Sequence, residues 1–557
     1  MKTFFKTILI SAALLLSVNS CLKDVTPQSS TITEEQALNA PGAFQNFVDG
    51  ITGALTGQFT YSAPDTDPYD FGYPSFFIQW DVMGQDLVPE TSSSEWFGTW
   101  YECGTALGPN YARCQVPWTY YFKWIKNCNV VLSVAGDNPS DDKKAGAGIA
   151  HAMRAMFYMD LARMYANTNY ATDKTAPTVP IVSEKTTPTE ACNNPRATNE
   201  EIWNFIIDDL NKAEDFLSGY IRPDKYTPDT TVVYGLKARA YLEMEDWANA
   251  ASYAKKAQNG YTLLTKEQYL SKTDGFNTPN DAWMFATANK ASDPNITLND
   301  ADSCWGSQMI IEVSGSHCGY SSNYVGPKRI DKHLYSTIPD TDFRKMCFLS
   351  PDLDAMSNAD ALVALADYTD DPAGVLNTAR TVSQRKTFEC IEIKFRPKDG
   401  EHNDQYAAFT VAIPLMRVEE MYLIEAEATG MQAGKQAEGI ALLTAFAKTR
   451  DASYTYGNHN EAYYNSSTSA FQNECWWQRR VELWGEGFAT KDIKRLNKGI
   501  IRNYAGTIHN EDCKWNIPNV PQWMTLCFVG TEANYNTALV QNPIPERPNA
   551  DSDEFVW

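Results

Sequence analysis

Aromatic side chains recur in two polar stretches of the sequence, residues 92–101 and 305–324. A sugar ring offers a flat face of C–H bonds and a rim of hydroxyl groups, so a site for an uncharged glycan needs exposed aromatic rings flanked by polar side chains. Both stretches meet that description, and Gln308 and Asn323 supply amide groups in the second. We therefore expect a ligand-binding role for six aromatic residues: Trp96, Trp100, Tyr101, Trp305, Tyr320 and Tyr324.

The six rings also admit a purely structural interpretation. Tryptophan is largely buried in most proteins, and a ring in a long loop can pack that loop onto the scaffold. The sequence leaves both interpretations open for any single ring. As the sharper hypothesis, we expect Trp96 and Trp305 to contribute to one aromatic surface.

A cluster of charged residues near position 480 is the second candidate for chemistry. Arg479, Glu482 and Glu486 recur at helical spacing, and Asp492 and Arg495 pair one turn apart in the following segment. Facing carboxylates suit acid–base catalysis, but neighbouring arginines keep a carboxylate ionised rather than raise its pKa. We therefore expect a buried ion-pair lattice. The sequence contains no nucleophile elbow, zinc-binding helix or phosphate loop, and we expect no enzymatic activity.

Residues 1–20 have the organisation of an export signal. Two lysines precede an apolar run over residues 8–16 that is too short to span a membrane, and small and polar residues lead to Cys21. This pattern is similar to a bacterial lipoprotein signal, which implies that Cys21 becomes an acylated membrane anchor. The alternative is an ordinary signal peptide followed by an incidental cysteine.

The formal net charge of −22 limits the partners of the chain. A protein this acidic, without a basic run, is not expected to bind nucleic acid. The chain has six histidines and no Cys-x-x-Cys pair, so we expect no zinc site. The turns at Asp65–Asp67 and Asp300–Asp302 lack the full pattern of a calcium loop. We expect no metal and no cofactor.

The cysteines admit two interpretations. Three local pairs could close loops by disulfide bonds: Cys103 with Cys114, Cys304 with Cys318, and Cys513 with Cys527. Buried thiols are the expectation for cysteines in predicted helices or strands, namely Cys128, Cys390 and Cys475.

Helical periodicity dominates the regions that must position these candidate sites. In residues 145–165, apolar side chains recur on two faces of one helix, with Met153 on one face and Tyr158 on the other. A helix that is apolar on two sides lies between neighbours, as in a stacked array. Thr198 followed by Glu201 predicts a capping box at the start of a further amphipathic helix.

Small residues spaced against aromatic residues recur in paired helices, which predicts units of tetratricopeptide type. We place these repeats at about residues 115–265 and 415–500. Elsewhere the composition shifts to turn-forming residues, which predicts an irregular, loop-rich insertion lobe over about residues 59–110 and 279–414. The expected fold is mostly α, and function usually resides in such insertions. Trp283 is expected in the core because its segment alternates like a strand, and further short strands are expected at residues 309–313 and 388–395.

Motifs along nearly the whole chain, taken together and in order, resemble those of the SusD/RagB family. They comprise the start at Cys21, residues 118–129, 154–165 and 179–180, Pro195-Arg196, the helix 201–213, Ala238-Arg239, and residues 414–427, 479–496 and 542–546. Residues 21–32 are polar and are expected to form a flexible tether. The resemblance implies a single SusD-like domain over residues 33–557.

The resemblance also implies a function. Members of the family are outer-membrane lipoproteins facing the cell exterior that bind oligosaccharides or polysaccharides. They deliver this ligand to a partner SusC-like TonB-dependent transporter and act as its lid. Ligand contacts come from comparable inserted regions, which align too poorly for any residue role to be transferred. Two alternatives stay open: the same machinery with peptide or glycopeptide cargo, and a secreted glycosidase with two facing carboxylates.

Overall fold

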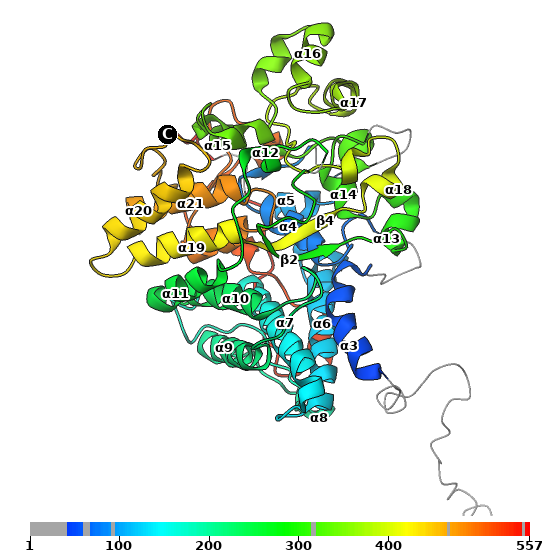
Figure 1. The fold of residues 1–557 in the computed structure, drawn as a ribbon, viewed down its shortest axis with the longest axis vertical. Helices are drawn as coiled ribbons and strands as arrows, with labels where there is room; N and C mark the ends of the chain where they lie inside the picture. The colour runs from blue at the N-terminus through cyan, green and yellow to red at the C-terminus, as the bar shows by residue number, and fades with distance from the viewer. Residues whose placement is uncertain are drawn as a thin grey trace, which may run out of the picture. The chain divides into compact units, whose positions relative to one another are not determined.

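The computed structural model describes residues 42–58, 67–90, 95–273, 275–313, 319–464, 468–548 and 552–557. The predicted signal, the tether with Cys21, and Asp65 and Cys318 lie outside the described residues. Phe47–Trp557 form one compact unit. Helices dominate this unit, as the sequence predicts (Figure 1).

A row of helices packed side by side forms the scaffold (Figure 1). α6 (Ala112–Ala135) packs on α7 (Asp141–Tyr165), and α7 packs on α9 (Asn199–Phe216). The row continues through α10 (Thr230–Glu243) to α11 (Trp247–Ala257). This succession is consistent with the predicted repeat of paired helices.

The row does not end where the insertion begins. α11 packs on α19 (Val418–Gly430), which in turn contacts α20 (Gln436–Ala447) and α21 (Ala470–Glu482). The two helical regions predicted from the sequence are therefore neighbours in one array.

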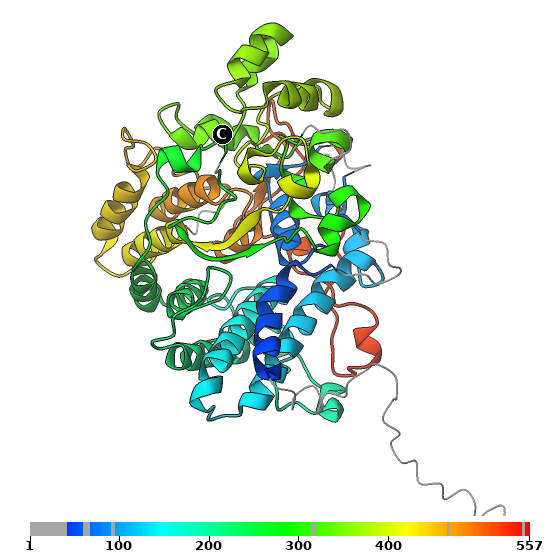
Figure 2. The same ribbon diagram turned by 45° about the vertical axis from the view of Figure 1, so that its right-hand side comes forward.

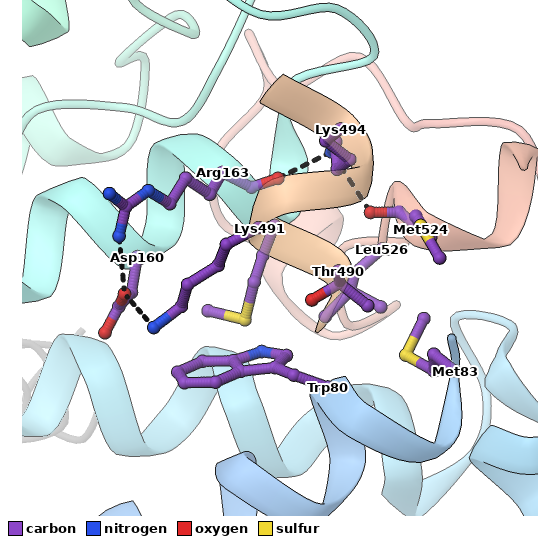
Figure 3. A pocket seen from close by; sticks show the side chains of 10 residues that line it. Trp80, Met83, Asp160, Arg163, Thr490, Lys491, Lys494, Met524 and Leu526 are labelled. Atoms are coloured by element: carbon purple, nitrogen blue, oxygen red, sulfur yellow. Dashed lines mark hydrogen bonds and ion pairs between the residues drawn. The ribbon is translucent and has the colours of Figure 1, made fainter. Parts of the chain in front are cut away.

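α7 lies inside the row and is buried on both of its predicted apolar faces. Met153 and Tyr158 are fully buried. Asp160, one of its few acidic residues, accepts a hydrogen bond from the Tyr73 hydroxyl at 2.6 Å and lies 3.6 Å from Arg163. The close-up in Figure 3 shows Asp160 between Arg163 and Lys491.

The short helix α22 (Ala489–Arg495) closes the C-terminal end of α7 (Figure 3). Lys494 Nζ donates hydrogen bonds to the carbonyl oxygens of Arg163 at 2.5 Å and Ala166 at 2.8 Å, which the end of a helix leaves without partners. The Lys491 ammonium lies 3.9 Å from the centre of a Trp80 ring. The remaining space has a volume of about 20 Å³, enough for one water molecule and too small for a ligand.

The predicted capping box at the start of α9 is confirmed. The Glu201 amide donates to the Thr198 hydroxyl at 3.2 Å, and the Thr198 amide donates to the Glu201 carboxylate at 2.8 Å. Two amides of the first turn, which have no partner within the helix, are thereby satisfied.

Two paired strands lie at the start and the end of the insertion predicted over residues 279–414. β2 (Trp283–Ala288) pairs antiparallel with β4 (Ala412–Arg417), and the strands run side by side in both views (Figure 1 and Figure 2). Trp283 is fully buried in β2, as predicted.

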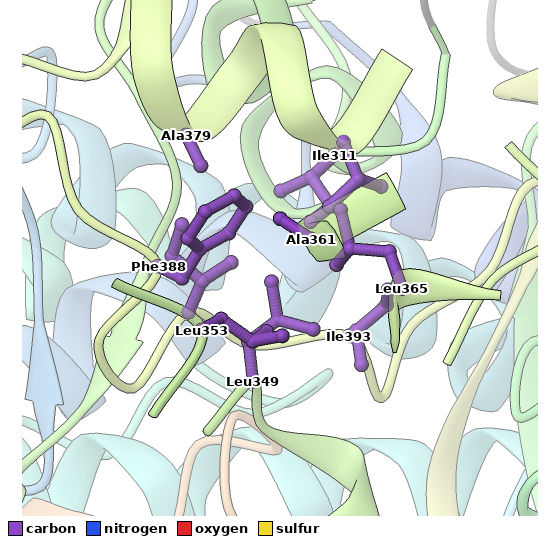
Figure 4. Close-up of a cluster of buried hydrophobic side chains, with 10 residues drawn as sticks. Ile311, Leu349, Leu353, Ala361, Leu365, Ala379, Phe388 and Ile393 are labelled. Carbon is purple, nitrogen blue, oxygen red and sulfur yellow. The ribbon is translucent and has the colours of Figure 1, made fainter. Parts of the chain in front are cut away.

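The prediction of strands at residues 309–313 and 388–395 is wrong. Met309 ends helix α14 (Trp305–Met309), and Ile391 and Glu392 form only isolated bridges. Their apolar side chains pack instead into a separate core beneath α16 (Asn358–Leu365) and α17 (Pro372–Asn377) (Figure 4). Its buried members are Ile311, Leu349, Leu353, Ala361, Leu365, Val375, Ala379, Phe388, Ile391 and Ile393.

The charged cluster near residue 480 is a buried ion-pair lattice, as predicted. Glu482, the last residue of α21, lies 3.2 Å from Arg344, 3.3 Å from Arg417 and 3.1 Å from Arg450. Burial by itself would raise the pKa of Glu482, but Arg450, Arg417 and Arg344 together hold it well below its ordinary value. A carboxylate held ionised in this way cannot serve as a general acid.

The predicted pair within this lattice is present: Asp492 lies 3.1 Å from Arg495. Asp492 also lies 2.7 Å from Arg479. Glu486 lies beyond the end of α21 and pairs with Arg417 at 2.8 Å.

The described cysteines are free thiols. The proposed pairs Cys103–Cys114 and Cys513–Cys527 are therefore not formed, whereas Cys128, Cys390 and Cys475 are buried as expected.

Short elements complete the described residues. The remaining helices are α3 (Ala43–Gly53), α4 (Tyr73–Val82), α5 (Gly98–Glu102), α8 (Pro188–Ala191), α12 (Lys266–Tyr269), α13 (Pro294–Thr297), α15 (Lys332–Thr337) and α18 (Gln405–Ala408). The remaining strands are β1 (Leu87–Val88), β3 (Arg329–Ile330), β5 (Ile500–Ile501) and β6 (Asn516–Ile517). Across the described ranges, no helix combines the length and apolar character needed to cross a membrane.

Candidate functional site

The two aromatic stretches of the sequence are brought together by a short strand pair. β1 and β3 are antiparallel, with Leu87 opposite Ile330 and Val88 opposite Arg329. The chain that leaves β1 leads to Trp96, and the chain that enters β3 comes from Tyr324. Segments more than 200 residues apart in sequence therefore meet at this point.

Two buried ion pairs fasten these segments to each other. Glu95, which precedes Trp96, lies 2.7 Å from Lys328 Nζ and also accepts a hydrogen bond from the Phe97 amide at 3.2 Å. Glu90 pairs with Arg329, and both side chains are fully buried. The backbone before Trp96 is thus held to the backbone after Tyr324 by two charge pairs. Breaking either pair would leave a buried charge without its partner.

Three of the six predicted aromatic residues form a contiguous cluster, which we call the ring cluster: Trp96, Tyr320 and Tyr324. The Trp96 and Tyr320 rings meet edge to face with centroids 6.0 Å apart, and Tyr320 and Tyr324 lie 5.4 Å apart. Tyr324 is 47% exposed, and Trp96 and Tyr320 are half-buried. The ring cluster therefore reaches the surface while its geometry is fixed by contacts among the rings.

A buried layer of rings supports Trp96. Tyr69 lies 6.1 Å from Trp96 and 5.7 Å from Trp100, measured between ring centroids. Tyr69 and Trp100 are at most 1% exposed. The Arg113 guanidinium covers the Tyr69 ring at 4.1 Å. Trp100 therefore holds the ring cluster in place and does not itself face solvent.

The expectation that all six rings are exposed is wrong for Trp100, Tyr101 and Trp305, which are at most 1% exposed. Tyr101 stacks on His509 and shares a hydrogen bond of 2.8 Å with its Nδ1. Trp305 meets Phe395 edge to face at 4.7 Å. The stretches fold into the short helices α5 and α14, which turn these rings toward the interior. Trp96 and Trp305 accordingly do not share one exposed surface.

Polar groups surround the second segment of the ring cluster. The Tyr320 amide donates to the Ser307 hydroxyl at 3.0 Å, and the Gly319 amide donates to the Asp302 carboxylate at 3.2 Å. Burial, with a contribution from the charge of Asp300, raises the pKa of Asp302 to about 7. Gln308, expected at the surface, is fully buried and donates to the Pro68 carbonyl at 3.3 Å.

The structure adds residues that the sequence analysis did not single out. The Tyr406 hydroxyl donates to Asp300 at 3.1 Å, and this ring is 43% exposed. Tyr406 stands alone in a polar run, the same signal that identified the other rings. Tyr69 could not be identified in this way. Its role comes from packing against Trp96 and Trp100, which are distant in the sequence.

A pocket much larger than the space beside Lys491 lies on the surface near α8. Its volume is about 620 Å³, and hydroxyl and amide side chains such as Ser183, Thr186 and Asn194 line it. Its lining residues include no aromatic ring, so it offers no stacking face for a sugar. The ring cluster is the better candidate for a binding site.

Family models match two separate parts of the chain. A family model described as "Starch-binding associating with outer membrane" matches residues 83–242, and the model of the SusD family matches residues 341–547. A search of curated proteins gives no match.

Several solved structures share the fold. A SusD-like carbohydrate-binding protein from Bacteroides vulgatus is 23% identical, with 89% of this chain and 97% of that chain covered and a TM-score of 0.67. The surface glycan-binding protein A from Bacteroides thetaiotaomicron, solved with laminarihexaose, is 15% identical, with 90% and 98% covered and a TM-score of 0.61. A laminarin-binding SusD-like protein is 16% identical, with 90% and 98% covered and a TM-score of 0.56. These structures show the same fold. The two family models together match about two thirds of the chain and confirm the resemblance seen in the sequence: the chain belongs to the SusD/RagB family.

Proposed function

We propose that the protein is a non-catalytic binder of oligosaccharides or polysaccharides and that the ring cluster is its contact surface. The observation that carries the proposal is the arrangement of Trp96, Tyr320 and Tyr324, which are partly exposed, in mutual contact and next to carboxylates. Aromatic faces stack on the C–H faces of sugars, and carboxylates accept hydrogen bonds from sugar hydroxyls.

Two of the structural relatives point the same way. One was solved with laminarihexaose and another binds laminarin, and both share the fold of this chain. Glycosidase activity is disfavoured because the most conspicuous carboxylate cluster, around Glu482, is paired with arginines in the interior.

Membership of the family supports the rest of the proposal. We propose that the protein is anchored to the outer membrane through an acylated Cys21, faces the cell exterior, and delivers its ligand to a SusC-like TonB-dependent transporter for which it acts as a lid. The scaffold of residues 33–557 works in this proposal as one domain, and its insertion over residues 59–110 and 279–414 carries the site.

Affinity electrophoresis in gels containing purified polysaccharides tests ligand binding. The chain from Leu22 onward should be retarded by at least one neutral polysaccharide, and Trp96→Ala should be retarded clearly less. Tyr535→Ala is the matched control because Tyr535 is 74% exposed and lies outside the ring cluster. Retardation of Trp96→Ala equal to wild type would show that the ring cluster is not the site.

Two further assays separate the alternatives. Release of new reducing ends from a bound polysaccharide would indicate a glycosidase, and binding to peptides with no glycan bound would indicate peptide cargo. Purification of the tagged lipoprotein from native membranes should bring with it a large barrel protein, and its repeated absence would contradict the lid model.

A further inference from the structure

We infer that the ring cluster selects uncharged saccharides and excludes anionic ones, an inference that rests on the proposed function. The first observation is the distribution of charge along the two segments that build the site. No lysine, arginine or histidine lies between Lys23 and Arg113, a stretch that holds twelve acidic residues. No lysine or arginine lies between Lys290 and Lys328. Trp96 comes from the first segment, and Tyr320 and Tyr324 come from the second.

The two cations that follow the second segment are paired with carboxylates of the protein. Lys328 pairs with Glu95 and Arg329 with Glu90, and all four side chains are at most 1% exposed. Arg113 is stacked on the buried Tyr69 ring rather than on the exposed Tyr324. An anionic ligand therefore meets Lys328 and Arg329 as neutralised pairs, and breaking either pair would leave a buried charge uncompensated.

Carboxylates, by contrast, are fixed beside the rings. Asp302 accepts from the amide of Gly319, the residue before Tyr320, and Asp300 accepts from the Tyr406 hydroxyl. Asn299, Asp300 and Ala301 all have positive φ, between 49° and 60°. Asn and Asp adopt the left-handed conformation more readily than other side chains, but it is unfavourable for Ala301, so the surrounding contacts must hold this turn in place.

This arrangement treats neutral and anionic ligands differently. Because the pKa of Asp302 is raised to about 7, both groups are carboxylates only above that pH. There a sugar hydroxyl can donate a hydrogen bond to Asp300 or Asp302, whereas a uronate or sulfate group has no proton to donate and is repelled by both carboxylates. The repulsion acts at a partly exposed site and is weakened by salt. We expect a difference of roughly tenfold in affinity for each ligand charge placed near the pair at low ionic strength.

The test uses polysaccharides that differ in charge but not in bulk. Laminarin, starch, xylan and galactomannan are each prepared as a hydroxyethyl ether, which is neutral, and as a carboxymethyl ether of the same degree of substitution. Affinity electrophoresis and titration calorimetry then compare the two forms at about 20 mM and about 500 mM NaCl, at about pH 8.5 so that Asp302 is ionised. The neutral ether should bind roughly tenfold more tightly at low salt, and the difference should shrink at high salt.

A double variant assigns the selectivity. Asp300→Asn with Asp302→Asn should reduce the difference between the two ethers, whereas Asp208→Asn, an exposed residue of α9, should leave it unchanged. If the double variant fails to fold, Asp300→Asn alone, at an exposed position, makes the same comparison. Equal or tighter binding of a carboxymethyl ether would overturn this inference alone. A folded protein that binds neither form of any polysaccharide would overturn it together with the proposed function.

Discussion

Glu95 Oε2 lies 2.7 Å from Lys328 Nζ, and both side chains are at most 1% exposed. Glu95 stands immediately before Trp96, and Lys328 stands four residues after Tyr324. The pair therefore ties together the two segments that present the ring cluster. The net contribution of such a pair to stability is small, because the attraction between the charges offsets little more than the cost of removing both from water.

Lys328→Met tests this connection. Removing one partner leaves the Glu95 carboxylate buried and unpaired, which should lower the free energy of unfolding by about 3–5 kcal/mol. Urea denaturation measures the change. Lys185→Met is the control, because Lys185 pairs with Asp137 at 2.9 Å on the exposed surface and its loss should have no measurable effect. A Lys328→Met protein as stable as wild type would show that the pair does not hold the segments.

Trp96→Ala and Trp305→Ala should separate binding from stability. Trp305 is buried against Phe395, so its truncation should cost about 3–5 kcal/mol in the free energy of unfolding. Trp96 is half-buried at the surface, so its truncation should weaken saccharide binding by roughly tenfold, equivalent to about 1.4 kcal/mol, with a smaller loss of stability. Denaturation and titration calorimetry of both variants give the comparison. The reverse pattern would contradict the assignment of the two rings.

The pKa of Glu482 predicts a particular response to acid. Its folded-state pKa lies below the ordinary value of 4.5, so its contribution to stability is present above about pH 4.5 and is lost as the pH falls through the folded value. Asp492 is shifted in the same direction, and its contribution is lost similarly. The free energy of unfolding should therefore decline below about pH 4.5.

Glu482→Gln isolates this effect. At pH 7 the variant should be less stable by about 3–5 kcal/mol, because Arg344, Arg417 and Arg450 lose a shared counter-charge. Its stability should then fall less steeply with acid than that of the wild-type protein. Parallel declines would show that Glu482 does not contribute to the pH dependence.

The capping box of α9 offers a local test of helix stability. Thr198→Ala removes the side-chain acceptor of the Glu201 amide and should cost about 1 kcal/mol. Thr189→Ala, at an exposed position of α8, is the control. Thermal denaturation compares the two, and equal melting temperatures would argue against the cap.

Membrane attachment depends on one residue in our proposal. Cys21→Ser removes the thiol that would carry acyl chains, and the chain should move from the membrane fraction to the soluble fraction. Fractionation with detection of the tagged protein measures this. Continued recovery of Cys21→Ser in the membrane fraction would contradict lipid anchoring.

Local signals in the sequence predicted the helices well. The two-faced pattern around Met153 and the Thr198–Glu201 capping box depend on neighbours within a few residues, and both are present in the structure. The strand predicted at residues 388–395 failed because a strand requires a partner that local sequence cannot specify. Its residues found apolar neighbours in the core beneath α16 and α17 instead.

The candidate site was only partly visible in the sequence for a similar reason. Composition identifies rings in polar loops, but whether a ring faces water depends on distant partners such as His509 for Tyr101 and Phe395 for Trp305. The ion pairs Glu95–Lys328 and Glu90–Arg329 join residues more than 230 positions apart. No periodicity within either segment predicts them.

The packing of α11 against α19 has a consequence for how the molecule assembles. The helices from α6 to α11 can form by contacts close in sequence, whereas α19 must cross the whole insertion to reach its neighbour. Contacts between distant parts of a chain form slowly because the intervening loop must first be closed. We therefore expect a two-stage folding reaction in which an N-terminal helical intermediate precedes docking of α19, and the binding site is completed last.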